Sequence, residues 1–335
     1  MTGSSPSPAF GTVPAPVMVV AEAEDGTFST PRAQPLAPLT LHPFVHALHY
    51  GSTCFEGLKA HRGADGIVRL FRLERHVARM RRTAGLLHLP VPPADLLAEA
   101  IRQATAANLE VVPEAPGALY LRPLLFGTDP NIGAAAHPSR GALLVVVASP
   151  VGDYFAGADR ALTLKVETDL PRTTPGFGEA KAGANYLLAL PATLEARRTD
   201  GADQVLFAPG GDVQETGAAN FLLLDEDRIV TRNLDGSFLH GVTRDSVLVL
   251  ARAAGLEVEE RPLSLEEVLA WRGEAALAGT AAVLTGVGAL LHQGQRYELH
   301  GGAVGPTTRR LREALLAVQR GEVEDAHGWT EPVLA

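Results

Sequence analysis

The sequence of 335 residues is poor in several features, and each scarcity disfavours a class of protein. It has a single cysteine, Cys54, so it cannot form an internal disulfide, and no Cys/His spacing is typical of a zinc site. Its longest apolar run, 142–148, has the length of one buried strand and is too short to span a membrane. Lys and Arg total 29 against 38 Asp and Glu, so no excess of positive charge favours nucleic acid as a partner.

The start of the chain, 1–16, contains no basic residue and no apolar run before a cleavage site, and the first arginine is Arg32. It therefore has the pattern of neither a secretory signal nor an arginine-rich transit peptide. It is rich in Ser, Pro and Gly, and we expect it to be loosely ordered. We predict a cytoplasmic protein without a membrane partner.

The composition, 46% apolar and 20% charged, is sufficient for a sizeable core, and the length corresponds to about two domains. We predict a small N-terminal domain at 1–150, a turn-rich linker at 151–160 and a larger domain at 161–335. Apolar periodicity predicts strands at 17–20, 58–61, 68–71, 118–125, 142–148, 161–168, 204–207, 220–224 and 228–231, the last three as a β-meander. It predicts helices at 74–87, 94–109, 181–198, 243–254 and 306–319. Because no regular βαβ cycle emerges, the expected fold class is α+β.

Lysine is also scarce, with only Lys59, Lys165 and Lys181, so a protein that needs a reactive amine has few candidates. Lys59 and Lys165 alternate with apolar neighbours, which predicts a solvated strand face for each. Lys181 follows a Pro/Gly loop and precedes small residues that leave room for a bulky partner at its amine. Tyr186 lies close enough in sequence to hydrogen-bond a phenolate or imine, which favours Schiff-base chemistry at Lys181. An ordinary loop lysine remains the simpler interpretation unless other residues support the site.

Other segments could hold the remainder of a cofactor. Glu215, at a strand-to-loop junction, could keep a pyridinium nitrogen protonated, although a solvated turn residue is its ordinary interpretation. Val242 and Thr243 follow Gly241 at the start of a predicted helix, where free N–H groups and the helix dipole favour an anion. Taken alone, that segment is better interpreted as a plain Thr N-cap. The Gly-Thr turn at Thr280 is a weaker signal of the same kind.

Together, eight segments resemble pyridoxal-phosphate aminotransferases of fold type IV, and they occur in that family's order. They are FEGLKAHRG, LFRLERHVARM, LYLRPLLFGTDP, SPVGDYF, EAKAGANY, QETGAANFLLL, LHGVTRD and AGTAAVLTGVG. The chain most resembles branched-chain-amino-acid aminotransferases, from about Phe10 to HGWT at 327–330. The resemblance implies a small α+β domain, a larger α/β-barrel-like domain, pyridoxal 5′-phosphate as cofactor, and a homodimer or higher homo-oligomer.

The resemblance also implies roles for individual residues. Lys181 would be the catalytic residue, which holds the cofactor covalently and moves a proton between the substrate α-carbon and C4′ of the cofactor. The other cofactor contacts would be Arg72, Val242, Thr243 and Thr280 at the phosphate, Glu215 at the pyridine nitrogen, Tyr186 at the ring oxygen and Leu239 at the ring face. The substrate contacts would be Arg122 at a distal carboxylate, Tyr120, Thr280 and Ala281 at the α-carboxylate, and Tyr50, Phe55 and Tyr154 as pocket walls.

The implied reaction is transamination between a branched-chain L-amino acid (Leu, Ile or Val) and 2-oxoglutarate. A guanidinium suits the dicarboxylate and an apolar wall suits the aliphatic side chain. Aminodeoxychorismate lyase activity, D-amino-acid transamination and a specialised-pathway aminotransferase are alternatives, and Arg122 within YLRP favours the transaminase over the lyase.

Two histidine features stand apart from this pattern. His240 occupies a position where the family usually has proline, and it could alter side-chain specificity, although a structural histidine is an equal interpretation. The spacing of His42, His46 and His49 could gather a metal, but no acidic ligand accompanies them. We therefore expect no metal site.

Overall fold

The computed structural model describes residues 10–152 and 160–334, which divide into two compact units. The first comprises Met1–Tyr154, Lys181–Gly183 and Val318–Ala335, and the second comprises Phe155–Ala180 and Ala184–Ala317. The prediction of a large domain running from 161 to 335 differs from this division in two places. Both the short segment at Lys181 and the C-terminal segment group with the first unit, because each makes strand contacts there. The predicted linker, 151–160, lies mostly outside the described residues.

Within its described residues, the first unit contains a nine-stranded sheet of order β17-β6-β5-β7-β8-β1-β2, with β3 paired to β1 and β4 paired to β7. Its strands are β1 (Val17–Glu24), β2 (Thr27–Phe28), β3 (Arg32–Pro35), β4 (Thr53–Phe55), β5 (Leu58–Arg62), β6 (Val68–Phe71), β7 (Ala118–Gly127), β8 (Ala142–Val151) and β17 (Thr330–Val333). Its helices are α1 (His46–Tyr50), α2 (Leu73–Leu86), α3 (Ala94–Ala106) and the 3-10 turn Leu109–Val111.

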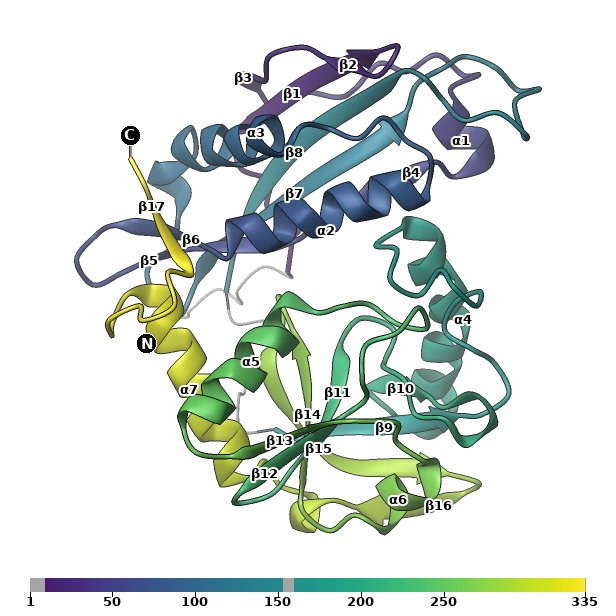
Figure 1. Cartoon of the computed structure of the whole chain (residues 1–335), viewed down its shortest axis with the longest axis vertical. Coiled ribbons are helices and arrows are strands. Elements are labelled where there is room, and N and C mark those ends of the chain that lie inside the picture. The colour runs from purple at the N-terminus through teal and green to yellow at the C-terminus, as the bar shows by residue number, and fades with distance from the viewer. Residues whose placement is uncertain (1–9, 153–159, 335) are drawn as a thin grey trace, which may run out of the picture. The chain divides into compact units, whose positions relative to one another are not determined.

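One face of this sheet is covered by α2 and α3, as Figure 1 shows. Val77 and Met80 of α2 and Leu97 and Ile101 of α3 are buried in one apolar cluster with residues of β5, β7 and β8. These helical residues recur at the three- and four-residue spacing of an amphipathic helix, which explains why the sequence predicted both helices. The apolar cluster fixes the position of α2, which carries part of the site described below.

Lys59 lies on the opposite face of β5, where the structure contradicts the predicted solvated position. Lys59 is 7% exposed, and its neighbour on the same face, His61, is 2% exposed. Lys59 lies directly opposite Tyr120 in the β5–β7 pair, so the two side chains share this face. Alternation identified the face of the strand correctly, but it could not show that the face is covered. Lys165, by contrast, is partly exposed and pairs with Asp200 at 2.8 Å.

Within its described residues, the second unit contains an eight-stranded curled sheet of order β10-β9-β15-β14-β11-β12-β13, with β16 paired to β15. Its strands are β9 (Leu162–Glu167), β10 (Gln204–Phe207), β11 (Asn220–Leu224), β12 (Arg228–Thr231), β13 (Glu257–Glu260), β14 (Glu274–Gly279), β15 (Val283–His292) and β16 (Gln295–Glu298). Its helices are α4 (Gly183–Asp200), α5 (Val242–Ala253), α6 (Leu265–Ala270), α7 (Pro306–Arg320) and the 3-10 turns Pro209–Gly211 and His300–Gly302.

The α+β class is confirmed, but the predicted meander is wrong. β11 and β12 form an antiparallel hairpin, whereas β10 lies at the other edge of the sheet and pairs in parallel with β9. Parallel strands need a long crossover, and α4 provides it between β9 and β10. In the described part of the chain, no helix combines the length and apolar character needed to cross a bilayer.

Candidate active site

Lys181 is held to the first unit by its backbone. Its carbonyl accepts a hydrogen bond from the Phe55 N–H at 3.0 Å, and its own N–H donates to Thr83 Oγ1 at 3.2 Å. The next residue, Ala182, forms an antiparallel bridge with Cys54 of β4. The side chain is half-buried, and Nζ lies 4.9 Å from the centroid of the Phe55 ring. The lysine predicted from the loop pattern is thus anchored between β4 and α2 with its amine beside an aromatic wall.

Phe55 also contacts the predicted substrate arginine. The guanidinium carbon of Arg122 lies 4.6 Å from the centroid of the Phe55 ring. Arg122 Nη2 donates to Tyr120 Oη at 3.0 Å, and a Cβ at Gly57 would lie only 1.9 Å from that same Oη. Gly57 therefore leaves the space that the phenol occupies. Four predicted residues, Lys181, Phe55, Tyr120 and Arg122, come together in this unit.

A buried polar cluster beside Lys181 was not singled out from the sequence. Glu56 is 1% exposed and accepts hydrogen bonds from Arg79 Nε at 2.6 Å, Arg79 Nη2 at 2.9 Å and His76 Nδ1 at 2.9 Å. Although burial raises it, Arg79 and His76 hold the pKa of Glu56 well below its usual range. Burial lowers the pKa of His76 and the charge of Lys181 lowers it further, whereas Glu56 opposes this lowering. The cluster thus lies within electrostatic reach of the lysine.

Arg72 lies at the other end of the same helix. It is the N-cap of α2 with a left-handed backbone (φ 51°), and its guanidinium stacks 4.7 Å over the Trp329 ring. At about 1.5 Å per residue, Arg72 is about 16 Å along the helix axis from Thr83, the residue that bonds the Lys181 backbone. Arg79 is one turn from Thr83 and shares its face. At eleven residues, about three turns, Arg72 also lies on the side of α2 that carries Thr83, so its role at the phosphate stays a prediction.

In the second unit, Glu215 is the centre of a buried network rather than a solvated turn residue. It is 1% exposed and accepts hydrogen bonds from Asn220 Nδ2 at 2.9 Å and the Leu239 N–H at 3.0 Å. Arg172 Nη1 lies 2.7 Å from Glu215 Oε1, and its guanidinium carbon is 5.5 Å from the centroid of the Tyr186 ring. The structure thus joins Glu215 to Leu239 by a direct hydrogen bond and to Tyr186 through Arg172. The only sequence signal for Arg172 is a lone arginine in the Pro/Gly loop before Lys181.

The start of α5 lies next to this network. Gly241 is the N-cap in an extended conformation, without a side-chain cap, so Thr243 in the first turn is not the N-cap that its residue type suggested. Asn220 Nδ2 also donates to the Leu239 carbonyl at 2.8 Å, and a Cβ at Gly241 would lie 1.9 Å from Asn220 Oδ1. Glycine therefore allows Asn220 to connect Glu215 to the helix that begins at Val242. The N–H groups of this first turn have the orientation that favours an anion.

The other predicted residues lie in different surroundings. Thr280 and Ala281 are half-buried in the turn between β14 and β15, next to Ala282, whose carbonyl accepts from Arg312 Nη1 at 2.8 Å. Tyr50 is 38% exposed at the end of α1, and its hydroxyl donates to the Ile132 carbonyl. Tyr154 lies outside the described residues.

The histidines contact separate partners. His240 Nε2 hydrogen-bonds to the Asp235 carbonyl at 2.9 Å within its own loop. His46 is buried with Nδ1 2.9 Å from Ser52 Oγ, whereas His49 Nε2 donates to the Pro43 carbonyl at 2.8 Å. Among the described residues, no group of three or more His, Cys, Asp or Glu side chains could hold a metal ion.

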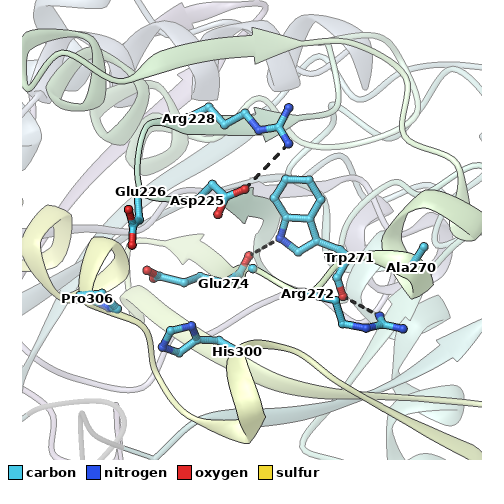
Figure 2. Close-up of a pocket in the computed structure, with 10 residues that line it drawn as sticks. Asp225, Glu226, Arg228, Ala270, Trp271, Arg272, Glu274, His300 and Pro306 are labelled. Carbon is cyan, nitrogen blue, oxygen red and sulfur yellow. Dashed lines mark hydrogen bonds and ion pairs between the residues drawn. The ribbon is translucent and has the colours of Figure 1, made fainter.

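A pocket of about 520 Å³ in the second unit contains none of these residues. Figure 2 shows its lining, which includes Asp225, Arg228, Trp271, Arg272 and Glu274. Asp225 pairs with Arg228 at 3.8 Å, Arg272 donates to backbone carbonyls, and Glu274 accepts from the first N–H groups of α7. Its charged groups thus serve the local structure.

Comparison with known proteins relates this geometry to a family. The family model described as amino-transferase class IV matches residues 53–290. A probable branched-chain-amino-acid aminotransferase of Streptomyces coelicolor is 40% identical over 309 residues, which cover 88% of this chain and 84% of the relative. The chain belongs to the class IV aminotransferase family. The branched-chain-amino-acid aminotransferase of Mycobacterium tuberculosis (strain H37Rv) is 38% identical over 341 residues, covering 96% of this class IV aminotransferase and 91% of the relative.

Solved structures agree with this class IV assignment. The branched-chain amino acid aminotransferase of Escherichia coli has a TM-score of 0.78 at 28% identity, covering 96% of this chain and 100% of that one. The PLP form of the enzyme from Thermobaculum terrenum has a TM-score of 0.79 at 26% identity, covering 96% and 99%. The resemblance inferred from the sequence is confirmed: the fold is type IV, the chain is an aminotransferase, and its cofactor is pyridoxal phosphate.

The residues of this class IV aminotransferase fit that cofactor chemically. Lys181 provides a primary amine, and Glu215 provides a buried carboxylate held by Asn220, Leu239 and Arg172. A carboxylate of this kind suits a protonated ring nitrogen. The start of α5 adds N–H groups suited to a phosphate.

Proposed function

We propose that the chain catalyses reversible transamination between a branched-chain L-amino acid (Leu, Ile or Val) and 2-oxoglutarate. The observation that carries this proposal is the contact of Arg122 with Phe55 at 4.6 Å, in the same unit as Lys181. One wall thus offers a guanidinium for a distal carboxylate and an apolar ring for an aliphatic side chain. The relatives named as branched-chain-amino-acid aminotransferases support the same substrate class.

Lys181 acts in this proposal as the proton carrier. Pyridoxal phosphate, when bound, withdraws electrons from the substrate's α-carbon. Lys181 Nζ would hold the cofactor and would carry the proton between the substrate's α-carbon and C4′ of the cofactor. Its backbone bonds to Phe55 and Thr83 fix the position of the main chain from which this side chain moves.

The remaining cofactor contacts are divided among three groups of residues. Glu215 holds the ring nitrogen protonated, Tyr186 donates to the ring oxygen and Leu239 packs against the ring. For the phosphate we propose Arg72, the N-cap residue of α2. Val242, Thr243 and Thr280 complete the phosphate set.

The carboxylate groups of the substrate meet different residues. Tyr120, oriented by Arg122 at 3.0 Å, binds the α-carboxylate together with the backbone at Thr280 and Ala281. Arg122 binds the distal carboxylate of glutamate or 2-oxoglutarate. Phe55 and Tyr50 form the apolar and aromatic walls.

A homodimer or higher homo-oligomer is part of the same proposal. Helix α4 exposes Leu187, Leu188, Leu190 and Leu194 at 67, 57, 46 and 52%. Leucines gathered on one helix are uncommon on the surface of a monomer and indicate an association surface. We also propose a cytoplasmic location, which the single buried cysteine, Cys54, supports.

A donor panel with 2-oxoglutarate tests the function. Leucine, isoleucine and valine should be the best donors, and added leucine should shift the visible absorption of the cofactor. Borohydride should trap the cofactor on Lys181, and Lys181→Ala should lose turnover. Pyruvate release from aminodeoxychorismate without amino transfer, or consumption of D-alanine alone from a racemate, would select the lyase or the D-amino-acid transaminase instead.

A further inference from the structure

Trp329, near the end of the chain, contacts the residue at which α2 begins. The Trp329 carbonyl accepts a hydrogen bond from the Arg72 N–H at 2.6 Å, and the guanidinium carbon of Arg72 lies 4.7 Å from the centroid of the Trp329 ring. Arg72 and Trp329 are only 6 and 7% exposed, so this contact is shielded from water. A segment distant in sequence therefore meets Arg72 through both its backbone and its side chain.

The backbone bond holds Arg72 in an uncommon conformation. Arg72 is left-handed (φ 51°), which is rare for a residue with a long side chain and persists only where the surrounding structure imposes it. Figure 1 shows β17 beside β6, and their ladder ends with Thr330 opposite Phe71. The bond from Arg72 to Trp329 extends that ladder to the residue at which the chain turns from β6 into α2.

The ring of Trp329 is itself held by further contacts. Phe71 meets it edge-on, with the centroids 5.8 Å apart and the planes at 86°, and His327 stacks on it at 4.4 Å with the planes at 26°. Asp325 closes the turn before Trp329, because it accepts from the Thr330 N–H at 2.6 Å and from Thr330 Oγ1 at 2.8 Å. The ring thus belongs to a well-fixed turn.

We propose that Trp329 is a positioning residue that orients Arg72 for the phosphate of the cofactor. This inference rests on the assignment of Arg72 to the phosphate in the proposed function. An aromatic face attracts a guanidinium and stacks against its plane, whereas the N–H donors that recognise a phosphate lie within that plane. Stacking on Trp329 therefore fixes the plane in which Arg72 donates.

The contribution of Trp329 comes from preorganisation. An arginine that nothing holds loses its rotamer freedom when it binds an anion, and a ring that already holds it removes that loss. Leucine at position 329 keeps the backbone bond to Arg72 but has no aromatic face. Trp329→Leu should weaken the binding of pyridoxal phosphate about 2- to 12-fold, which corresponds to the roughly 0.5–1.5 kcal/mol needed to order one such side chain.

The test compares pyridoxal phosphate with pyridoxal, which lacks the phosphate. The full-length enzyme, stripped of cofactor, is titrated with each, and the visible absorption gives the two dissociation constants. Trp329→Leu should weaken pyridoxal phosphate as stated and leave pyridoxal unchanged, since Arg72 is assigned to the phosphate alone. Equal weakening of both ligands, or of neither, would overturn the proposal.

Trp329→Phe separates stacking from packing. Phenylalanine and leucine leave cavities of similar size beside Arg72, but only phenylalanine keeps an aromatic face. Trp329→Phe should therefore retain most of the affinity for pyridoxal phosphate, and a loss as large as that in Trp329→Leu would overturn the proposal.

Trp271, the other of the two tryptophans in the chain, provides the matched control. Its ring centroid lies 5.1 Å from the guanidinium carbon of Arg228 in the second unit, so it makes a comparable stack away from Arg72. Trp271→Leu should change neither affinity. A phosphate-specific loss equal to that of Trp329→Leu would contradict the proposal.

His327→Ala decides the matter if Trp329→Leu does not fold. His327 is exposed, so alanine is compatible with folding, yet its removal takes away the stack that holds the Trp329 ring. This variant should show a smaller loss that is again specific to the phosphate. Unchanged affinity for pyridoxal phosphate would count against the proposal.

A double-mutant cycle shows whether Trp329 acts through Arg72. Adding Trp329→Leu to Arg72→Gln should weaken pyridoxal phosphate little further, because the guanidinium is already gone, and full additivity would contradict the proposal. Unchanged affinity in Arg72→Gln alone would instead refute the phosphate assignment of Arg72. Retained turnover in Lys181→Ala would refute the proposed function itself.

Discussion

Gly57→Ala is a minimal change that should act on substrate binding through a single contact. A Cβ at this position would lie 1.9 Å from Tyr120 Oη and 2.8 Å from Cζ, distances that real structures do not tolerate. Gly57 does not need a left-handed backbone, since no positive φ occurs there, so alanine causes no backbone strain. The added methyl group must therefore displace the phenol of Tyr120.

The size of the effect follows from the bond that is lost. Tyr120 Oη accepts from the charged guanidinium of Arg122 at 3.0 Å. A hydrogen bond to a charged group contributes about 1.5–3 kcal/mol, and each ~1.4 kcal/mol corresponds to a factor of ten in rate. We expect kcat/KM with 2-oxoglutarate to fall about 10- to 100-fold in Gly57→Ala, because the phenol and the guanidinium both lose their positions.

The assay is steady-state kinetics with leucine and 2-oxoglutarate, each varied separately. Tyr120→Phe should reproduce most of the loss. The double variant Gly57→Ala/Tyr120→Phe should be little more impaired than Tyr120→Phe alone, because both changes remove the same bond to Arg122 and only the contact with the ring, at 2.8 Å from Cζ, remains. Full activity in Gly57→Ala, or a double variant as impaired as the two losses multiplied, would refute the reasoning.

Three further predictions concern other parts of the chain. Glu215→Gln should lower kcat and also destabilise the fold by about 1–3 kcal/mol, because Arg172 then loses the charge of its buried partner. Thermal unfolding measures the loss of stability, and an unchanged Tm would contradict it. Burial, aided by the charge of Glu56, raises the pKa of Cys54 to about 12. The native enzyme should therefore resist a thiol reagent at pH 8 and react only when unfolded. Rapid labelling of the native enzyme would contradict this prediction. The double variant Leu187→Glu/Leu194→Glu should reduce the oligomer mass measured by light scattering. The control, Leu48→Glu, lies outside α4 and should leave that mass unchanged. An unaltered mass in the double variant would exclude α4 from the interface.

The secondary structure was predictable where local pattern is decisive. The strands Val68–Phe71, Gln204–Phe207, Asn220–Leu224 and Arg228–Thr231 begin and end where their apolar alternation predicted. β14 and β15 were missed, since their small and apolar residues do not alternate and both strands are almost wholly buried. The placement of β10 beside β9 also could not be predicted, because strand pairing depends on a contact formed across the whole of α4.

The residues of the site also divide into those that the sequence identified and those that it did not. Lys181 was identifiable because lysine is rare in this sequence, and Glu215 because it occurs in a motif that the family shares. Arg79, His76 and Arg172 were not, since a single arginine or histidine in a helix or loop carries no signal until its partner is known. Their partners, Glu56 and Glu215, lie 20 or more residues away in the chain.

The sequence by itself thus determined the family, the cofactor and the reactive amine, because these follow from residue types in a fixed order along the chain. Only the tertiary structure decided that Lys59 is buried and that Glu56 and Glu215 are each enclosed by donors. The physical reason is that burial and charge pairing are properties of surroundings. Segments distant in sequence supply those surroundings, and no local pattern encodes them.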